Sequence, residues 1–496
     1  MSCRNHAHAN ESMHRMKQLL KLGVLIYFLL PVTPNLAEDI ALPEMGDSAG
    51  ALISPREEHQ IGQMFFWRLQ QATPLIDDPE VNSYIRALGY RIASNSDEPN
   101  LDYTFFMVPD PSVNAFAAPG GFIGVHSGLL LTAATEDELA SVIAHEIAHI
   151  TQRHILRSFE RYKRMTVPRT AALIAAALLG IADPSAGQAA IMAVQAGNIQ
   201  SMLDYSRAHE AEADNLGMQT LVASGFDPEA MPSFFEKLQQ ASRFYGGDSV
   251  PEFLRTHPVT TSRIADAKGR AVQYRVRPQL GDHKQFYLIK EKLRVMLTED
   301  TADLLQYYEA VLSKDNTENM DAVKYGYALA LLKTGQHTRA REQLQPLLDK
   351  EHDRLAYQLA LADIELAVGQ VNTALAIYDD NQRLYPDDEA LTIKQVQALL
   401  RNGYASKADR LLQTQLELGE NSGHIYRLLA QTKERMGQES QSHSYMAEYY
   451  YQSGQLKAAA DQLRLASETA GRDEYQHAKV ASRLREVEEA LAQLEQ

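Results

Sequence analysis

The sequence predicts a mainly α-helical chain with two parts, an α+β domain that contains a small sheet and an all-α solenoid that follows it. Three observations predict this fold class. Apolar residues recur at helical spacing around position 145, strand-like runs occupy residues 104–108 and 122–126, and four glycines in the second half recur at intervals of 34 residues. A chain of 496 residues is long enough for two to four domains. We place the first domain at residues 55–275 and the second at residues 285–496.

The first 37 residues have the pattern of a secretory signal peptide. Basic residues between positions 15 and 21 precede a short apolar run at 22–30, and cleavage is expected after Ala37. The apolar run is too short to span a bilayer comfortably, and an uncleaved N-terminal anchor is the alternative interpretation. Residues 38–54 would then form a linker to the first domain.

Composition and charge exclude some functions. The hydrophobic fraction of 45% and the charged fraction of 23% are those of an ordinary globular protein. A net charge of −16 argues against a nucleic-acid partner. The only cysteine, Cys3, precedes the apolar run of the signal. The mature chain would therefore contain no cysteine and need no disulfide in an oxidising compartment.

The run from His145 to His149 has the form HExxH, with Glu146 as its second residue. On a helix, histidines four residues apart share one face and can bind one ion, while the glutamate between them can act as a general base. Thr135 and Glu138 form a capping-box pattern that predicts the start of this helix. We expect a half-buried helix with one apolar side, made by Leu139, Val142, Ile143, Ile147 and Ile150. The alternative is a pair of ordinary histidines on an amphipathic helix.

A catalytic zinc ion needs three protein ligands and one open position. Gln152 and Ile155 stand where one extended HExxH pattern would continue, so the third ligand must come from elsewhere. A second predicted helix offers Glu210 and Asp214, which are four residues apart on one face, whereas Glu212 points away. One carboxylate could bind zinc while the other accepts the second ring proton of a ligand histidine. A solvated acidic helix face is the alternative reading.

The HExxH run together with the run 210–214 (EAEAD) resembles the ExxAD signature of the CAAX-prenyl-endopeptidase class of zinc metallopeptidases. Residues 114–123 resemble this family's strand beside the cleft, and Thr256-His257-Pro258 followed by Arg263 resembles its HP…R segment. The matches extend over roughly residues 55–270. The resemblance implies a zincin-type metalloprotease domain in which Glu210 is the third zinc ligand.

The predicted chemistry is metal-assisted hydrolysis of a peptide bond. One zinc ion per subunit would be held by His145, His149 and Glu210, with Asp214 behind them, and Glu146 would be the general base. By their position in the family motifs, His257 and Arg207 are candidates to stabilise the oxyanion. His257 could instead be a fourth ligand that closes the site. A plain loop histidine beside a proline is the alternative.

Other histidines and an apolar segment are interpreted more simply. His154 and His209 are expected on solvated helix faces, and His126 is assigned no role. Residues 170–182 and 189–196 predict an apolar helical hairpin, 170–196, whose arms are each shorter than a transmembrane span. It could be a buried packing hairpin, or a plate that rests on a membrane surface or covers the cleft.

The second domain is predicted to be an array of tetratricopeptide (TPR) repeats, each a helix–turn–helix unit. The sequence features that recur with this period are Gly335, Gly369, Gly403, Gly437, Ala340, Ala374 and Ala408. A further unit is expected around Gly454 and Ala459, half a period out of step, with the helix 475–495 as a cap. Such arrays usually bind peptides or proteins on a concave surface, although a role in packing against the first domain is compatible.

The order of signal, ExxAD metalloprotease and repeat array is similar to a family of periplasmic proteases that act in outer-membrane β-barrel assembly. The resemblance implies periplasmic location, degradation of misfolded or stalled outer-membrane proteins, contact with the barrel-assembly machinery through the repeats, and a chaperone-like role. A strand edge near the zinc would favour extended substrates. The main alternative is a TPR scaffold or chaperone with a normally closed zinc site. Aminopeptidase or prenyl-peptide specificity is a further alternative.

Overall fold

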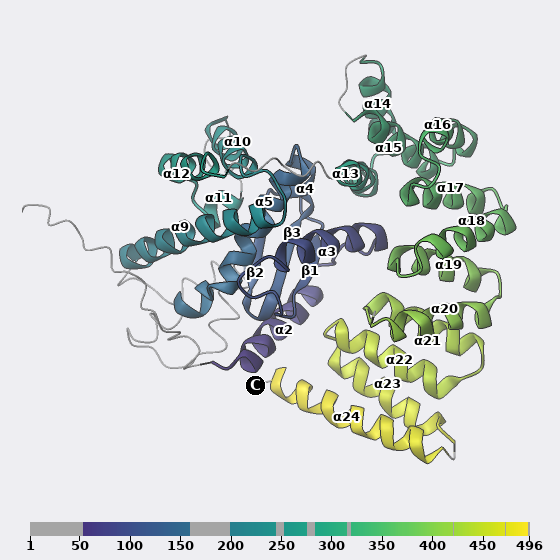
Figure 1. Ribbon diagram of the computed structural model, residues 1–496. Coiled ribbons are helices and arrows are strands. Elements are labelled where there is room, and N and C mark those ends of the chain that lie inside the picture. The colour runs from purple at the N-terminus through teal and green to yellow at the C-terminus, as the bar shows by residue number, and fades with distance from the viewer. Residues whose placement is uncertain are drawn as a thin grey trace, which may run out of the picture. The chain divides into compact units, whose positions relative to one another are not determined.

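The computed structural model (Figure 1) describes most of the two predicted domains. The residues it describes are 53–158, 199–244, 252–274, 283–314, 319–419, 421–471 and 473–494. The predicted signal peptide and the apolar hairpin 170–196 lie outside them. In the described part of the chain, no helix combines the length and the hydropathy needed to cross a membrane.

Two capped helices open the described chain. Helix α2 (Pro55–Ala72) begins after Ser54, which forms a complete capping box with Glu57. Helix α3 (Pro79–Ala93) begins after Asp78, whose carboxylate accepts hydrogen bonds from two backbone amides of the first turn. A proline follows each cap, at a position where its missing N–H leaves no hydrogen bond unmade.

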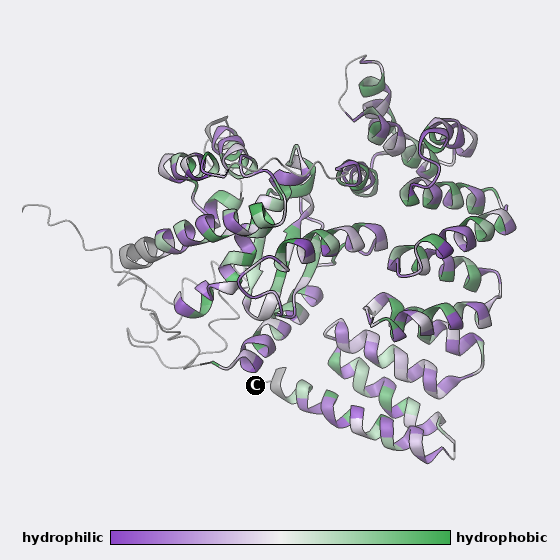
Figure 2. Cartoon of the chain, in the orientation of Figure 1, coloured by the Kyte–Doolittle hydropathy of each residue, from purple (hydrophilic) through white to green (hydrophobic). Residues whose placement is uncertain are grey.

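A three-stranded sheet follows, with strand order β1-β3-β2. Strand β1 (Thr104–Val108) pairs in parallel with β3 (Phe122–His126), and β2 (Ala115–Ala118) pairs antiparallel with β3 through the short 3₁₀ turn η2 (Pro119–Gly121). This confirms both predicted strands and places β2 at one edge of the sheet. The strands are buried almost throughout, and in Figure 2 they carry mostly hydrophobic colours.

The helix of the HExxH run, α5 (Glu136–Thr151), follows the short helix α4 (Ser127–Thr132). It packs against the sheet and α3, and also against α9 (Ile199–Ala223) and α10 (Ala230–Phe244). Because neighbours surround it, α5 is buried on almost every side rather than on one apolar side as predicted. The residues expected on its apolar side, Leu139, Val142, Ile143, Ile147 and Ile150, are all in the core.

The start of α5 differs from the predicted capping box. Thr135 does cap the helix and accepts a hydrogen bond from the Glu138 amide. The Glu138 carboxylate accepts instead from the Ala134 amide at 2.7 Å and forms an ion pair with Lys237 of α10 at 2.6 Å. The Glu138 side chain therefore does not complete the capping box and instead forms an ion pair that links α5 to α10.

Short helices α11 (Glu252–Thr256) and α12 (Thr261–Ala271) lie within the first predicted domain. The chain after them consists of helix pairs, as predicted. The helices that follow are α13 (Lys284–Leu297), α14 (Thr301–Leu312), α15 (Met320–Lys333), α16 (His337–Lys350), α17 (Leu355–Ala367), α18 (Val371–Leu384), α19 (Glu389–Arg401), α20 (Ala405–Glu417), α21 (Gly423–Arg435), α22 (Glu439–Gln452), α23 (Leu456–Thr469) and α24 (Glu474–Leu494). In Figure 2 they mix hydrophilic and hydrophobic residues, as amphipathic helices do.

The repeat glycines lie where the periodicity predicts. Gly335, Gly369, Gly403 and Gly437 each follow the first helix of a pair with positive φ, which ends the helix and lets the next one fold back. The alanines five residues after the first three of these glycines are fully buried in the second helices. Gly454 separates α22 from α23, and α24 follows as the expected last helix.

Helices α2 and α3 contact the repeat helices. The buried Glu80 of α3 forms ion pairs with Lys292 of α13 at 2.5 Å and Lys394 of α19 at 3.2 Å. In α2, Trp67 meets Tyr451 edge to face, with ring centroids 5.3 Å apart. These contacts connect the first described helices to both early and late repeats.

Candidate metal centre

The HExxH residues and Glu210 are brought together by a close crossing of α5 and α9. His145 and His149 lie one turn apart on α5, and Glu210 lies on α9. At Gly217 of α9, a side-chain Cβ would lie 3.0 Å from the His145 Cα, so the absence of a side chain there allows the two helices to approach. The crossing therefore directs the Glu210 carboxylate to the histidines of α5.

His257 reaches the same place from the end of α11. Its amide donates to the Phe253 carbonyl at 2.7 Å, and its ring stacks on the buried Phe253 ring with centroids 4.8 Å apart. The Phe253 amide in turn donates to the Val113 carbonyl, just before β2. In this arrangement His257 is therefore held next to the chain that leads into the edge strand.

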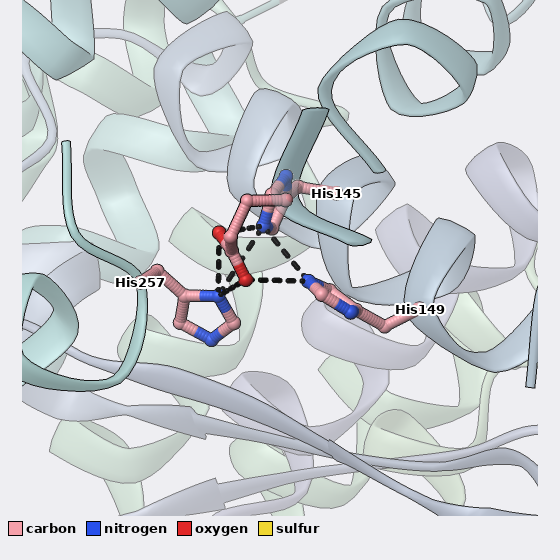
Figure 3. Close-up of side chains that lie close together, drawn as sticks. His145, His149 and His257 are labelled. Carbon is pink, nitrogen blue, oxygen red and sulfur yellow. Dashed lines mark hydrogen bonds and ion pairs between the residues drawn. The ribbon is translucent and has the colours of Figure 1, made fainter. Parts of the chain in front are cut away.

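The three histidine rings converge on one point (Figure 3). Nε2 of His145 lies 3.0 Å from Nε2 of His149 and 3.4 Å from Nδ1 of His257. The Glu210 carboxylate closes the cluster, 2.9 Å from Nδ1 of His257 and 3.4 Å from Nε2 of both other histidines. All four ligand atoms lie within 4.8 Å of one another.

These donor atoms fit a zinc ion. Ligand atoms about 2.1 Å from one ion in a tetrahedral arrangement lie about 3.4 Å apart, close to the separations observed. Three imidazole nitrogens and one carboxylate are a ligand set that zinc commonly takes. The buried cluster could therefore hold one metal ion.

Asp214 and Arg263 support the cluster from behind. Oδ1 of Asp214 lies 3.1 Å from Nδ1 of His145, the ring nitrogen that faces away from the cluster. Arg263 of α12 donates to both Asp214 oxygens at 2.7 Å, and its Nη1 lies 2.9 Å from Glu210. The sequence pattern marks Arg263 only as part of the HP…R motif and does not predict this role. Its position six residues after His257 was the one signal available.

The electrostatics of the cluster favour positive charge at its centre. Burial raises the pKa of Glu210, but the charge of His257 and hydrogen bonds from the histidines outweigh burial and hold that pKa well below its usual value. Burial likewise lowers the pKa of His145, but hydrogen bonds to Asp214 and Glu210 and their charges raise it to about 10. A cation at this point is therefore stabilised by two nearby carboxylates.

Glu146 is buried beside the cluster, not in it. Its Oε1 lies 3.6 Å from Nε2 of His257 and has no hydrogen-bond partner among the described residues. A buried carboxylate oxygen without a partner is costly. A water molecule between Glu146 and the metal position would satisfy it, as a general base requires.

Other residues that the sequence singled out lie outside the four-residue cluster. Arg207 is exposed on α9 and lies outside the four-residue cluster. The expectation that His154 and His209 are solvated is wrong, since they are 3% and 4% exposed. Their rings stack on each other, and Nδ1 of His154 lies 2.8 Å from Nδ1 of His149. The chain turns sharply after α5, at Arg153 with φ of 50°, which helical periodicity could not predict.

Fold and site together define a metallopeptidase of the HExxH type. The sequence profile of peptidase family M48 matches residues 79–271. The β-barrel assembly-enhancing protease of Escherichia coli strain K12 is 34% identical over 91% of this chain and 92% of its own length. A putative β-barrel assembly-enhancing protease of Vibrio cholerae is 35% identical over 82% of this chain and 84% of its own. The mitochondrial metalloendopeptidase OMA1 of Schizosaccharomyces pombe is 32% identical over 36% of this chain and 50% of its own. The chain belongs to peptidase family M48.

Proposed function

We propose that the protein is a zinc metalloendopeptidase in which His145, His149 and Glu210 hold one zinc ion per subunit. The observation that carries this proposal is the convergence of these donors, with His257, within 4.8 Å. Asp214 would accept the Nδ1 proton of His145 and so direct its Nε2 to the metal. The EAEAD run would thus supply one ligand, Glu210, and the carboxylate of Asp214, which supports another ligand, His145.

Glu146 is the proposed general base. It takes a proton from the attacking water and delivers it to the leaving amine of the cleaved peptide bond. Its burial and the free Oε1 (among the described residues) support this role. A bound zinc ion would supply Lewis acidity toward the water and the substrate carbonyl.

His257 is the proposed gate of the site. Its Nδ1 occupies the fourth donor position, which a catalytic zinc site leaves open for water. We infer that this arrangement is the closed state and that a shift of the His257 segment opens it. If His257 also takes part in the reaction, its Nε2, which lies 3.6 Å from Oε1 of Glu146, is the atom that would stabilise the oxyanion. Arg207 would have to turn inward from the surface to share that role.

The proposed substrates are misfolded or stalled outer-membrane β-barrel proteins in the periplasm. The names of the two β-barrel assembly-enhancing relatives support this choice. So does strand β2, which is buried but pairs only with β3 among the described strands, so that its other edge has no strand partner where an extended substrate segment would pair. The repeat helices offer a surface for the barrel-assembly machinery and for a chaperone-like role. Membrane contact through residues 170–196 stays a prediction.

A second function is favoured by the fourth donor. A site with four protein ligands is typical of structural zinc, so the protein could act as a TPR scaffold or chaperone whose site is normally closed. The two functions differ in what happens to an unfolded substrate. The protease cuts it, whereas the scaffold only keeps it from aggregating.

The test is digestion of a urea-denatured outer-membrane barrel protein, diluted into buffer, with the same protein folded in detergent as control. We expect internal cuts, mapped by mass spectrometry, in the unfolded protein only. Stepwise loss of N-terminal residues would indicate an aminopeptidase instead. Suppressed aggregation without any cut would support the scaffold and contradict the proposed protease.

A further inference from the structure

A second buried layer lies behind His149. His154 follows α5 and is 3% exposed, with Nδ1 2.8 Å from Nδ1 of His149 and Nε2 3.1 Å from Oε2 of Glu212. Each ring nitrogen of His154 therefore has one partner. Among the described residues, no carboxylate contacts His149 on this side, in contrast to His145, whose Nδ1 faces Asp214 directly.

Only one distribution of protons satisfies this chain of contacts when His149 binds a metal. Nε2 of His149 faces the cluster, so as a ligand atom it carries no proton, and the proton of the ring is on Nδ1. Nδ1 of His154 must then accept that proton's hydrogen bond. The proton of His154 is consequently on Nε2, where it is donated to the Glu212 carboxylate.

The surroundings hold His154 in this orientation. Its ring stacks on that of His209, with centroids 4.1 Å apart and planes 12° from parallel. Nη1 of Arg157 donates to the same Glu212 oxygen at 3.0 Å, and Ser158 donates to the His154 carbonyl at 2.8 Å. Glu212 and His209 come from α9, the helix that also carries Glu210. Helix α9 thus carries Glu210 of the cluster and also the two residues that hold His154, the partner of His149.

We propose that His154 is a positioning residue for the metal site, a neutral imidazole that orients ligand His149 while Glu212 fixes its tautomer. This rests on the proposed role of His149 as a ligand. Partners behind metal ligands typically change metal affinity about 10- to 100-fold when they are removed. The two ligand histidines of α5 then differ in kind, since a carboxylate supports His145 and an imidazole supports His149.

The test measures the zinc dissociation constant of the full chain by competition with a chromophoric chelator. His154→Phe keeps a flat ring for stacking on His209 but removes the acceptor, and we expect zinc to bind about 10- to 100-fold more weakly. His154→Asn places an amide oxygen near the former Nδ1, and we expect it to restore most of the affinity. The matched control is His126→Phe, which removes a buried histidine that contacts Ser112 and lies outside the cluster.

Thermal unfolding of the metal-free variants shows which of them fold. Wild-type affinity in a folded His154→Phe protein overturns the proposal. So does an Asn variant as weak as the Phe variant, since the acceptor would then be irrelevant. If the Phe variant does not fold, the comparison of wild type with His154→Asn and Glu212→Leu decides, and we expect only Glu212→Leu to weaken zinc binding. A wild-type protein that binds no zinc would instead contradict the proposed function itself.

Discussion

Arg263 donates two parallel hydrogen bonds of 2.7 Å to Asp214, the carboxylate that faces His145. The guanidinium is 9% exposed and Asp214 is 1% exposed, so the pair is buried together. Such a fork fixes both the position and the charge of the carboxylate. The orientation of a proposed zinc ligand thus depends on a residue from a third helix, α12.

Replacing Arg263 tests this support. Arg263→Met leaves the Asp214 and Glu210 charges without their buried partner, and we expect the free energy of unfolding of the metal-free protein to fall by about 3–5 kcal/mol. Chemical denaturation measures it. Lys268→Met, in the same helix, breaks an exposed pair with Glu236 and should change stability by at most about 1 kcal/mol. Equal effects of the two variants would contradict the role given to Arg263.

Removing His257 tests the gate. His257→Ala leaves three ligands, so we expect one zinc ion per chain to be retained but released at least about tenfold faster to a chelator. With the fourth position open to water, cleavage of an unfolded protein should rise. Zinc analysis and a fluorescent peptide-release assay measure both quantities. Normal zinc content with lower cleavage would show that His257 takes part in the reaction and is more than a gate.

Glu80 predicts a pH dependence of stability. Burial raises the pKa of Glu80, but the charges of Lys292 and Lys394 outweigh burial and lower that pKa below the ordinary value of 4.5. A lowered carboxyl pKa stabilises the fold above about pH 4.5, and this stabilisation is lost as the pH falls through the folded-state pKa. The contribution of Glu80 to the free energy of urea unfolding should therefore be nearly the same at pH 7 and 5 and smaller at pH 4.

Glu80→Gln is the variant for this comparison. It should be less stable than wild type at pH 7, because Lys292 and Lys394 lose their shared buried partner. The difference between the two proteins should shrink as the pH falls through 4.5, because the unfolded chain takes up a proton on Glu80 there before the folded protein does. A constant difference across the three pH values would exclude Glu80 as the titrating group.

Gly454 tests the contact between α2 and the repeats. Its φ is 70°, and a Cβ there would lie 2.5 Å from the Trp67 Cβ, whereas Gly437 has φ of 71° and open space around it. Alanine at either position carries the cost of a left-handed backbone, about 1–2 kcal/mol. We expect Gly454→Ala to cost about 1–3 kcal/mol more, because the methyl group overlaps Trp67. Equal melting temperatures for the two variants would exclude this contact from the folded protein in solution.

Periodicity and spacing predicted the features that depend on local sequence. The two strands, the helix of the HExxH run and the 34-residue repeat are confirmed because each is encoded in a short window. The convergence of Glu210 and His257 on that helix depended on family resemblance, since it joins segments far apart in the chain. The sequence did not predict the roles of Arg263 and His154 behind the ligands, for the same reason. The expectation of a solvated His154 is wrong because the backbone turn at Arg153 and the stacking on His209 depend on tertiary packing, which local periodicity does not encode.

Glu146 offers the most direct measurement of the proposed mechanism. Wild type and Glu146→Gln would be compared for zinc content and for cleavage of an unfolded outer-membrane barrel protein. We predict one zinc ion per chain in both proteins and cleavage by wild type alone, because the glutamine keeps the shape of the site but cannot accept a proton. Cleavage by Glu146→Gln at the wild-type rate, or a zinc-bound wild type that never cuts, would contradict the assignment of Glu146 as the base of a zinc peptidase.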